Sequence, residues 1–418
     1  AGWTDSEGGE GAFLNNSSYA RKKAYNVPRT REIFGLSYQN GSWWPNGFYN
    51  ETQARAQGQS HSITPRLWIG ETMEGDDYVP EDHPMWNWFY EELKNRYEQQ
   101  KTADGEPYFL APNYFTRWGS GIFDLGSPDF TFAQRENLYN QSPANWPSNH
   151  FSPGGSLQHT NTILMGVYYN APDLTPGQVY NSLIGMELAG KMGKYSGIYA
   201  FNSYEWYPGF AQNIYLPTGT LERSDKAPLN PNLQIALPFL AHEFGNVYVA
   251  WGNHTKKSTD ITKVLNLAFL DPGMASKDRW YPNNQSTPQG TYPGYSPSVS
   301  DYHQNFAYLA DLPHFGMEMW SRTGKEVADG TAYYCTYRLD GGPWIEKLSN
   351  GSDLLHANAN QRGFARIRIK NNRACLYYYN PYGDNQRRNI EIKNPLNPSQ
   401  TWTGVVSGNG VHVVNITL

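Results

Sequence analysis

The stretch that indicates the fold is ILMGVYYNAPDLTPGQVYNSLIGMELAGKMGKYSGIYAF, residues 163–201. Its first seven residues form a near-continuous apolar run, which is typical of a strand covered on both faces. Thr175 and Pro176 then begin a helical pattern, because Thr is a good N-cap and Pro suits the first helical position. A second buried strand follows at 197–201. A strand, a helix and a strand in this order predict parallel strands joined by a right-handed crossover.

The same alternation extends to both sides of this unit. Further strands are expected at 33–38, 63–70, 108–111, 247–251 and 264–270, and further helices at 84–100, 232–244 and 304–322. Seven or eight such units in about 300 residues fit a (β/α)8 barrel of the TIM type better than an open doubly wound sheet. No Gly-x-Gly-x-x-Gly sequence follows a strand, which disfavours a dinucleotide-binding domain. We therefore expect an α/β barrel with long aromatic loops over residues 1–330.

Residues 331–418 have a different pattern, because apolar and polar residues alternate there. The runs 364–370 and 374–379 flank Asn371-Asn372, and this arrangement predicts a hairpin. Further alternating runs follow toward the C-terminus. We expect a small antiparallel β-sandwich in this region, preceded by a last barrel strand near 333–339.

The composition excludes several classes of protein. The 418 residues include 33 Lys and Arg against 38 Asp and Glu, a net charge of −5, and 15% are aromatic while only 17% are charged. Many large rings with little charge argue against disorder. An acidic chain offers little to neutralise a phosphate backbone, so nucleic-acid binding is not expected. No apolar run approaches the roughly 20 residues that a membrane span needs.

The polar residues and the two cysteines bear on the compartment. Asn, Ser, Thr, Gln and Tyr dominate over Lys and Glu, which is typical of secreted proteins that handle neutral ligands. We expect a secreted, periplasmic or cell-surface protein whose signal peptide has been removed. Cys335 and Cys375 are too few for a four-ligand metal site. They either form a disulfide that closes a loop of roughly forty residues or remain two buried free thiols.

Carboxylates follow several of the predicted strands, at the ends where a barrel carries its active site. Glu205 stands beside Trp206 just after the buried strand 197–201, and an unpaired carboxylate there would be costly. Asp271 opens an Asp-Pro-Gly turn and Asp173 precedes a helix, so these two also have structural interpretations. The candidate catalytic residues are Glu205, Asp271, Asp173 and Glu71.

The sequence gives little indication of a bound metal ion or cofactor. The loop Glu71–Asp77 holds four carboxylates in seven residues, which fits either a solvated acidic loop or a weak structural Ca²⁺ site. His242-Glu243 lies in a predicted helix, but Asn246 stands where the zincin pattern requires a second histidine. We therefore assign no zinc and no cofactor, and expect His242 to be packed or to cap its helix.

Carboxylates and aromatic rings at strand ends have a common chemical use. Hydrolysis of a glycosidic bond needs two carboxyl groups, one acting as an acid and the other as a nucleophile or base. Sugars stack their C–H faces on Trp and Tyr rings, while their hydroxyl groups bind Asn and His. The candidate substrate-binding residues are Trp206, Trp251, Asn253, His254, Trp118, Asn113 and Asn170.

The chain resembles the TIM-barrel glycoside hydrolases of secreted polysaccharide-degrading systems. The resemblance is carried by YAFNSYEW at 199–206, LAFLD at 267–271 and the β-rich tail VHVVNI at 411–416. In many such barrels the acid follows strand four and the nucleophile follows strand seven. The resemblance therefore implies a carbohydrate substrate and points to Asp173 and Asp271, or to Glu205 if the strand count moves by one.

Two other functions stay open on the residues alone. A non-catalytic carbohydrate-binding protein on a degenerate barrel would keep the aromatic rings, and the Asn-Glu pair familiar after strand four is absent here. A polysaccharide lyase would use a Tyr or His base near a cation that neutralises a uronate. Two carboxyl groups within about 5–10 Å across one cleft would favour hydrolysis.

Overall fold

The structure is a computed structural model, and its description covers a large part of the chain. The described residues are 3–5, 30–32, 38–39, 42–43, 50–60, 63, 67–70, 84–112, 137, 140, 159–167, 175–201, 203–204, 212–215, 221–224, 227–228, 231–251, 312–349, 353–382, 387–407 and 410–418.

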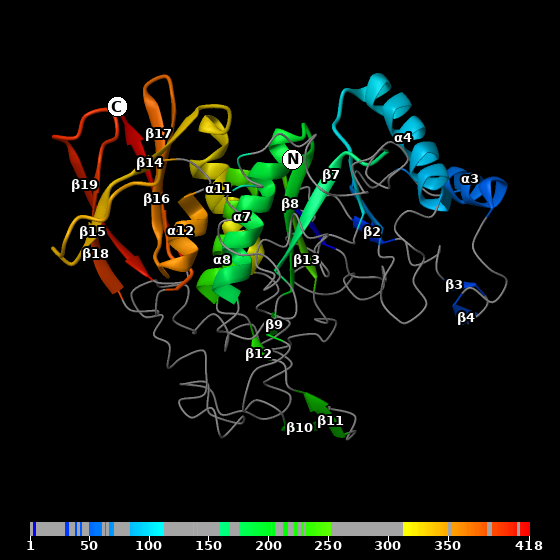
Figure 1. Ribbon diagram of the computed structural model, residues 1–418, viewed down its shortest axis with the longest axis horizontal. Helices are drawn as coiled ribbons and strands as arrows, with labels where there is room; N and C mark the ends of the chain where they lie inside the picture. Colours follow the sequence, from blue (N-terminus) through cyan, green and yellow to red (C-terminus); the bar gives the residue numbers. More distant parts are fainter. Residues whose placement is uncertain are drawn as a thin grey trace.

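Seven parallel strands form two ladders, and Figure 1 labels β2, β7, β8 and β13 among them. The first ladder runs, in spatial order, through β1 (Trp3–Asp5), β13 (Val247–Trp251), β8 (Tyr195–Phe201) and β7 (Thr162–Val167). The second runs through β2 (Thr30–Glu32), β5 (Leu67–Gly70) and β6 (Phe109–Pro112). These strands confirm most of the expected ones, although β2 precedes the predicted 33–38 run and 264–270 lies outside the described residues. Within the described part of the chain no ladder joins β1 to β2, so barrel closure is not part of this description.

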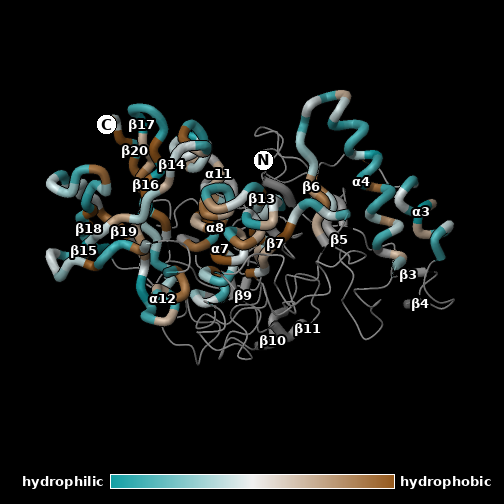
Figure 2. The backbone as a smooth tube through the Cα atoms, turned by 45° about the horizontal axis from the view of Figure 1, so that its top comes forward, coloured by the Kyte–Doolittle hydropathy of each residue, from teal (hydrophilic) through white to brown (hydrophobic). Residues whose placement is uncertain are grey.

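Helices connect the parallel strands as the sequence predicts. They are α4 (Pro84–Asp104) before β6, α7 (Thr175–Lys191) between β7 and β8, and α8 (Pro231–Phe244) between β8 and β13. Ile163, Met165 and Val167 of β7 pack in one cluster with α7 and α8. Figure 2 shows the hydrophobic stretches of α7, α8 and β7 beside one another.

The opposite face of the strands has its own apolar cluster. Leu164 alternates with Ile163 and Met165 along β7 and belongs to that second cluster. Its members come from five strands and are Leu67, Phe109, Ala111, Leu164, Tyr199, Val247 and Val249. Both faces of the strands are therefore buried, which explains why their sequences are nearly continuous apolar runs.

Asn161 joins the two parallel ladders. Its Oδ1 accepts the Leu110 N–H at 2.7 Å and its Nδ2 donates to the Tyr108 carbonyl at 2.9 Å. Its own N–H donates to the Leu110 carbonyl at 3.2 Å, and its carbonyl accepts the Tyr195 N–H at 2.8 Å. Because these contacts lie at the starts of β6, β7 and β8, the three strands run in the same direction from a common amino edge.

The C-terminal region is an antiparallel sandwich. One sheet has the order β14 (Thr331–Cys335), β16 (Phe364–Lys370), β17 (Arg373–Tyr379), β20 (Val411–Thr417), and the other β15 (Tyr337–Leu339), β18 (Arg387–Lys393), β19 (Thr401–Ser407). Asn371 turns the predicted hairpin with a φ of 56°. The last barrel strand expected near 333–339 is wrong, because β14 and β15 pair antiparallel with β16 and β18 inside the sandwich.

Three short helical elements fill the space between the sandwich and the parallel strands. They are α11 (Leu312–Thr323), the 3₁₀ helix η6 (Lys325–Val327) and α12 (Asp353–Ala359). A single core cluster includes side chains of α7, α8, α11, α12 and the β16–β17 pair. The sandwich therefore shares a core with the helices that cover the parallel strands (Figure 1). None of the helices among the described residues has the length and apolar character needed to cross a membrane.

The two cysteines are free thiols, so the disulfide alternative is wrong. Cys335 belongs to the core between the two sheets of the sandwich, whereas Cys375 belongs to the core shared with the helices. The two side chains therefore lie on opposite faces of one sheet. Burial raises the pKa of both thiols to about 12.

Replacing Asn161 should destabilise the fold. Asn161→Ala leaves the fully buried Leu110 without the acceptor for its N–H, which we expect to cost about 1–3 kcal/mol of unfolding free energy. Denaturant unfolding measures this loss. The matched control is Asn389→Ala, which truncates an exposed side chain on β18. Equal stability of the two variants would contradict the role of Asn161 in joining the ladders.

The thiols should be unreactive in the folded protein. At pH 8 a thiol with a pKa of about 12 carries almost no thiolate, and both sulfurs are buried. A chromogenic disulfide reagent should therefore detect no thiol in the native protein and two after unfolding without reductant. Detection of no thiol after unfolding would indicate a disulfide instead.

Candidate functional site

The carboxyl ends of β7, β8 and β13 are aligned at one edge of the sheet. The parallel register pairs Val167 with Ala200, and Ala200 with Ala250. Phe201 and Trp251, the last residues of β8 and β13, are also paired. The segments that leave these strands therefore start side by side, and they contain most of the candidate site residues.

The ends of β5 and β6 form a similar pair of exits. Gly70 is paired with Pro112 at the last position of the ladder. Glu71 and Asn113 follow these two residues directly in the sequence. Because Asn161 joins the amino ends of β6 and β7, the exits of β5 and β6 lie at the same edge as those of β7, β8 and β13. We call this edge, defined by Gly70, Pro112, Val167, Phe201 and Trp251, the carboxyl edge.

The connection from β8 to α8 is a long insertion, and segments near its two ends pair with each other. β9 (Ser203–Tyr204) pairs antiparallel with β12 (Ala227–Pro228), and β10 (Gln212–Tyr215) pairs with β11 (Leu221–Ser224). Figure 1 shows both small ladders beyond the ends of β8 and β13. Glu205 follows Tyr204 directly. The residue just before Glu205 in the sequence, Tyr204, is therefore held by its pairing with Ala227.

Most of the predicted site side chains lie outside the described residues. Among the candidate catalytic residues these are Glu205, Asp271, Asp173 and Glu71. Among the candidate substrate-binding residues they are Trp206, Asn253, His254, Trp118, Asn113 and Asn170, and only the backbone of Trp251 is described. The structure thus aligns the exits that lead to Glu71, Asn113, Asn170, Asp173 and Glu205, and it describes no contact between their side chains.

Burial in the fold explains the shifted pKa values of His242 and Lys194. Burial lowers the pKa of His242 to about 3, and its ring lies 4.9 Å from that of Trp320, as expected for a packed histidine. Burial lowers the pKa of Lys194 to about 8, and its Nζ donates to the Thr160 carbonyl at the amino edge. Among the described residues no group of three or more His, Cys, Asp or Glu could hold a metal ion, and the loop 71–77 lies outside them.

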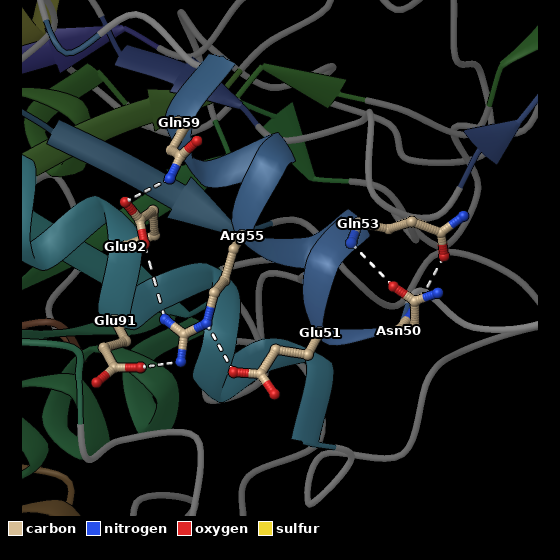
Figure 3. A network of polar contacts seen from close by, with 7 residues as sticks. All are labelled: Asn50, Glu51, Gln53, Arg55, Gln59, Glu91 and Glu92. Carbon is tan, nitrogen blue, oxygen red and sulfur yellow. Dashed lines mark hydrogen bonds and ion pairs between the residues drawn. The ribbon is translucent and has the colours of Figure 1, made fainter.

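A polar network joins the helices α3 (Glu51–Ser60) and α4 (Figure 3). Arg55 of α3 binds Glu51 at 2.8 Å and Glu91 of α4 at 2.7 Å, and it lies 3.7 Å from Glu92. These hydrogen bonds raise the pKa of Arg55. The carboxylates are thus paired with a cation, so the network fastens α3 to α4 and has no free acid for catalysis.

The sandwich is attached to the helices by a buried ion pair. Arg368 of β16 donates from Nε to the Glu243 Oε1 at 2.7 Å and from Nη2 to the Glu243 carbonyl at 3.0 Å. Its Nη1 donates to the carbonyls of Ala328 and Gly330 at 3.1 and 3.0 Å. The side chains of Arg368 and Glu243 are only 13% and 1% exposed. Since the guanidinium group is so fully bonded, this pair orients the sandwich and is not a site for a ligand.

Comparisons with known proteins find similarity to solved structures alone, at low sequence identity and low TM-score. No protein-family model matches the chain, and no curated protein matches it. Among solved structures it is similar to a GH30 endoxylanase from Clostridium papyrosolvens, with 10% identity, a TM-score of 0.34 and coverage of 100% and 96% of the two chains. It is also similar to a cyclic α-maltosyl-(1→6)-maltose hydrolase from Arthrobacter globiformis, with 9% identity, a TM-score of 0.39 and coverage of 95% and 76%.

A third solved structure of the same kind is a noncanonic maltogenic α-amylase from Thermotoga neapolitana, with 9% identity, a TM-score of 0.37 and coverage of 100% and 99%. All three names are those of enzymes that act on carbohydrates.

Breaking the buried ion pair should be costly. Arg368→Met leaves Glu243 buried without its cation, and we expect a loss of about 3–5 kcal/mol of unfolding free energy. Arg373→Met is the matched control, because Arg373 pairs with Glu326 where both side chains are about 60% exposed, and its loss should stay below about 1 kcal/mol. Equal losses in denaturant unfolding would contradict the assignment of the sandwich contact to Arg368.

Proposed function

We propose that the protein is a glycoside hydrolase that cleaves a polysaccharide or oligosaccharide. In this proposal residues 1–330 form a (β/α)8 barrel, the strand expected at 264–270 completes it, and the sandwich is packed against it. The observation that carries the proposal is the carboxyl edge, at which Glu71 comes directly after the last residue of β5 and Glu205 comes four residues after the last residue of β8. A secreted or cell-surface location suits an enzyme that acts on polymers.

The proposed chemistry uses carboxyl groups and a water molecule. Glu205 is the proposed acid, because it comes soon after β8, a strand buried on both faces, and a catalytic acid needs surroundings of low dielectric to stay protonated. The second carboxylate, acting as nucleophile or base, comes from Asp173, Asp271 or Glu71. Asp173 is favoured by position, because β7 and β8, the strands that precede Asp173 and Glu205 in the chain, are adjacent in the sheet. Hydrolysis would require the two carboxyl groups to lie roughly 5–10 Å apart.

The aromatic and amide side chains would bind the sugar rings. Trp206 and Trp251 follow or end the neighbouring strands β8 and β13, so their rings are proposed to stack on sugar C–H faces. Asn253, His254, Asn170, Asn113 and Trp118 would complete the subsites from the other exits. This arrangement would place the scissile bond between the exits of β7 and β8.

The test is the release of reducing ends from a panel of polysaccharides by wild type and variants. Glu205→Gln should lower kcat by about 100- to 10,000-fold, because the amide cannot donate the proton to the leaving group. Asp173→Asn, Asp271→Asn and Glu71→Gln identify the second carboxylate by the same loss. The matched control is Glu106→Gln, an exposed residue before β6 that should keep full activity.

Three outcomes would count against the proposal in different ways. Full activity of Glu205→Gln would exclude Glu205 as the acid. Retained glycan binding by a wild type that releases no reducing ends would favour a non-catalytic carbohydrate-binding protein. An unsaturated product that absorbs in the ultraviolet would identify a lyase.

A further inference from the structure

Strand β19 is the outer strand of its sheet. The sheet has the order β15, β18, β19, so among the described residues β19 pairs with β18 alone. Its sequence, TWTGVVS, holds no charged residue and no proline, and its pairing with β18 runs from end to end without a bulge. Proteins usually protect a free strand edge with one of these features, because its unpaired N–H and carbonyl groups can bind another strand. β19 is therefore an unprotected edge.

The outer strands β15 and β20 have partners within the chain. β15 is the other outer strand of the same sheet, and its Tyr337 N–H and carbonyl bond to Ile345 at 3.1 and 2.7 Å. β20 is an outer strand of the facing sheet, and its Asn415 Nδ2 donates to the Arg322 carbonyl of α11 at 3.3 Å. Within the described part of the chain β19 has no such partner on its outer side.

The hydrogen-bond pattern identifies the groups of β19 that face outward. In an antiparallel pair, successive residues turn their N–H and carbonyl groups alternately toward the partner strand and away from it. The Gln400 carbonyl accepts the Asn394 N–H at 2.9 Å, so Gln400 faces β18. Thr401 then faces away, and its partner Lys393 agrees, because the Lys393 N–H donates to the Thr336 carbonyl on the β15 side at 2.9 Å. The outward residues, which we call the open edge, are Thr401, Thr403, Val405 and Ser407.

Side chains of the open edge are accessible to a partner. Thr401, Thr403 and Val405 are exposed. Val405 is 38% exposed, and Leu396, in the loop that precedes β19, is 57% exposed. Both are large apolar residues, which are mostly buried in the described part of the chain. A partner strand that covered Val405 would gain hydrophobic contact in addition to backbone hydrogen bonds.

The open edge is complementary to itself. If two copies of β19 pair antiparallel with Gly404 opposite Gly404, Thr403 of each copy lies opposite Val405 of the other, and Thr401 lies opposite Ser407. All four of these residues face outward, so each pair can exchange two N–H···O bonds. Thr and Val are β-branched and favour strand pairing. The whole length of β19 is therefore matched by a second copy.

Charges around the open edge do not oppose this pairing. β19 itself holds none, and on β18 Lys393 is opposite Thr401 and Arg387 is opposite Ser407. In the two-fold arrangement Lys393 of one copy and Arg387 of the other would be separated by three strand spacings of about 4.8 Å. That separation exceeds the Debye length of roughly 8 Å at physiological ionic strength. A second copy can therefore approach without these like charges meeting.

We propose that β19 is a self-association surface, at which the open edges of two copies pair antiparallel about a two-fold axis at Gly404. The two three-stranded sheets then form one continuous sheet across the dimer. Because the contact comprises one strand from each copy, it buries little area, and we expect a weak dimer that forms at micromolar or higher concentration. This inference is independent of the proposed function.

Sedimentation velocity of the full chain over a concentration series tests the inference. Wild type should show a monomer–dimer equilibrium. Val405→Lys places a charge on the open edge and should raise the dimer dissociation constant by about tenfold or more, because lysine opposes edge pairing. Asn389→Lys is the matched control and should leave the dimer unchanged. Asn389 is exposed and lies opposite Val405, but it belongs to β18, one strand away from the open edge.

The register is tested by restoring charge complementarity. Thr403 of one copy faces Val405 of the other in the proposed pairing. Thr403→Glu combined with Val405→Lys therefore places opposite charges across both of these pairs. This double variant should recover most of the association that Val405→Lys loses, and high salt should remove the recovery.

Several outcomes would overturn the inference. A wild type that stays monomeric at every concentration would reject self-association and leave the open edge to a strand of another protein. Equal weakening of the dimer by Val405→Lys and Asn389→Lys would place the contact elsewhere. Oligomers larger than a dimer would reject the two-fold pairing, because that contact uses the open edge of both copies. A double variant as weak as Val405→Lys would reject the register about Gly404.

Discussion

The parallel strands share one direction because Asn161 ties the starts of β6, β7 and β8 together. Its side-chain amide takes the place of a backbone group and satisfies both polar groups that Tyr108 and Leu110 present at this point. A slip here would move the exits of β5 and β6 relative to those of β7 and β8. The alignment of the carboxyl edge therefore depends on a contact at the opposite edge of the sheet.

The sandwich and the parallel strands are coupled at two places with different chemistry. On one side the buried pair of Arg368 and Glu243 is bonded on almost all of its polar atoms. On the other side the stacked rings of Tyr180 and Tyr382 form an apolar contact with polar tips. The first contact fixes orientation through directional bonds, and the second contributes buried area beside α7. Two contacts at opposite ends of a shared core make it hard for the sandwich to move independently.

The hydrophobic periodicity of the sequence predicted the helices and strands that bury one face or both faces. It missed the helix and the short strands that bury few side chains or are too short to show a period. The expected strands at 163–169 and 247–251 and the expected helices at 84–100 and 232–244 are present as β7, β13, α4 and α8. Helix α3 was not predicted, because its sequence ETQARAQGQS buries only Ala54 and Gly58 and has no apolar stripe. The short ladders of the β8–α8 insertion were missed too, since ladders of two to four residues are too short to show a period.

The sequence by itself determined the alternating strands and helices, the β-rich tail, and the carboxylates and rings that follow strand ends, because hydrophobic periodicity and strand-end chemistry are local properties of the chain. Only the tertiary structure decided that Cys335 and Cys375 stay apart, that 331–339 joins the sandwich, and that the Tyr382 ring stacks on Tyr180 of α7. These outcomes depend on which faces meet between segments far apart in the chain. That choice is made by packing and hydrogen bonding, which no local pattern encodes.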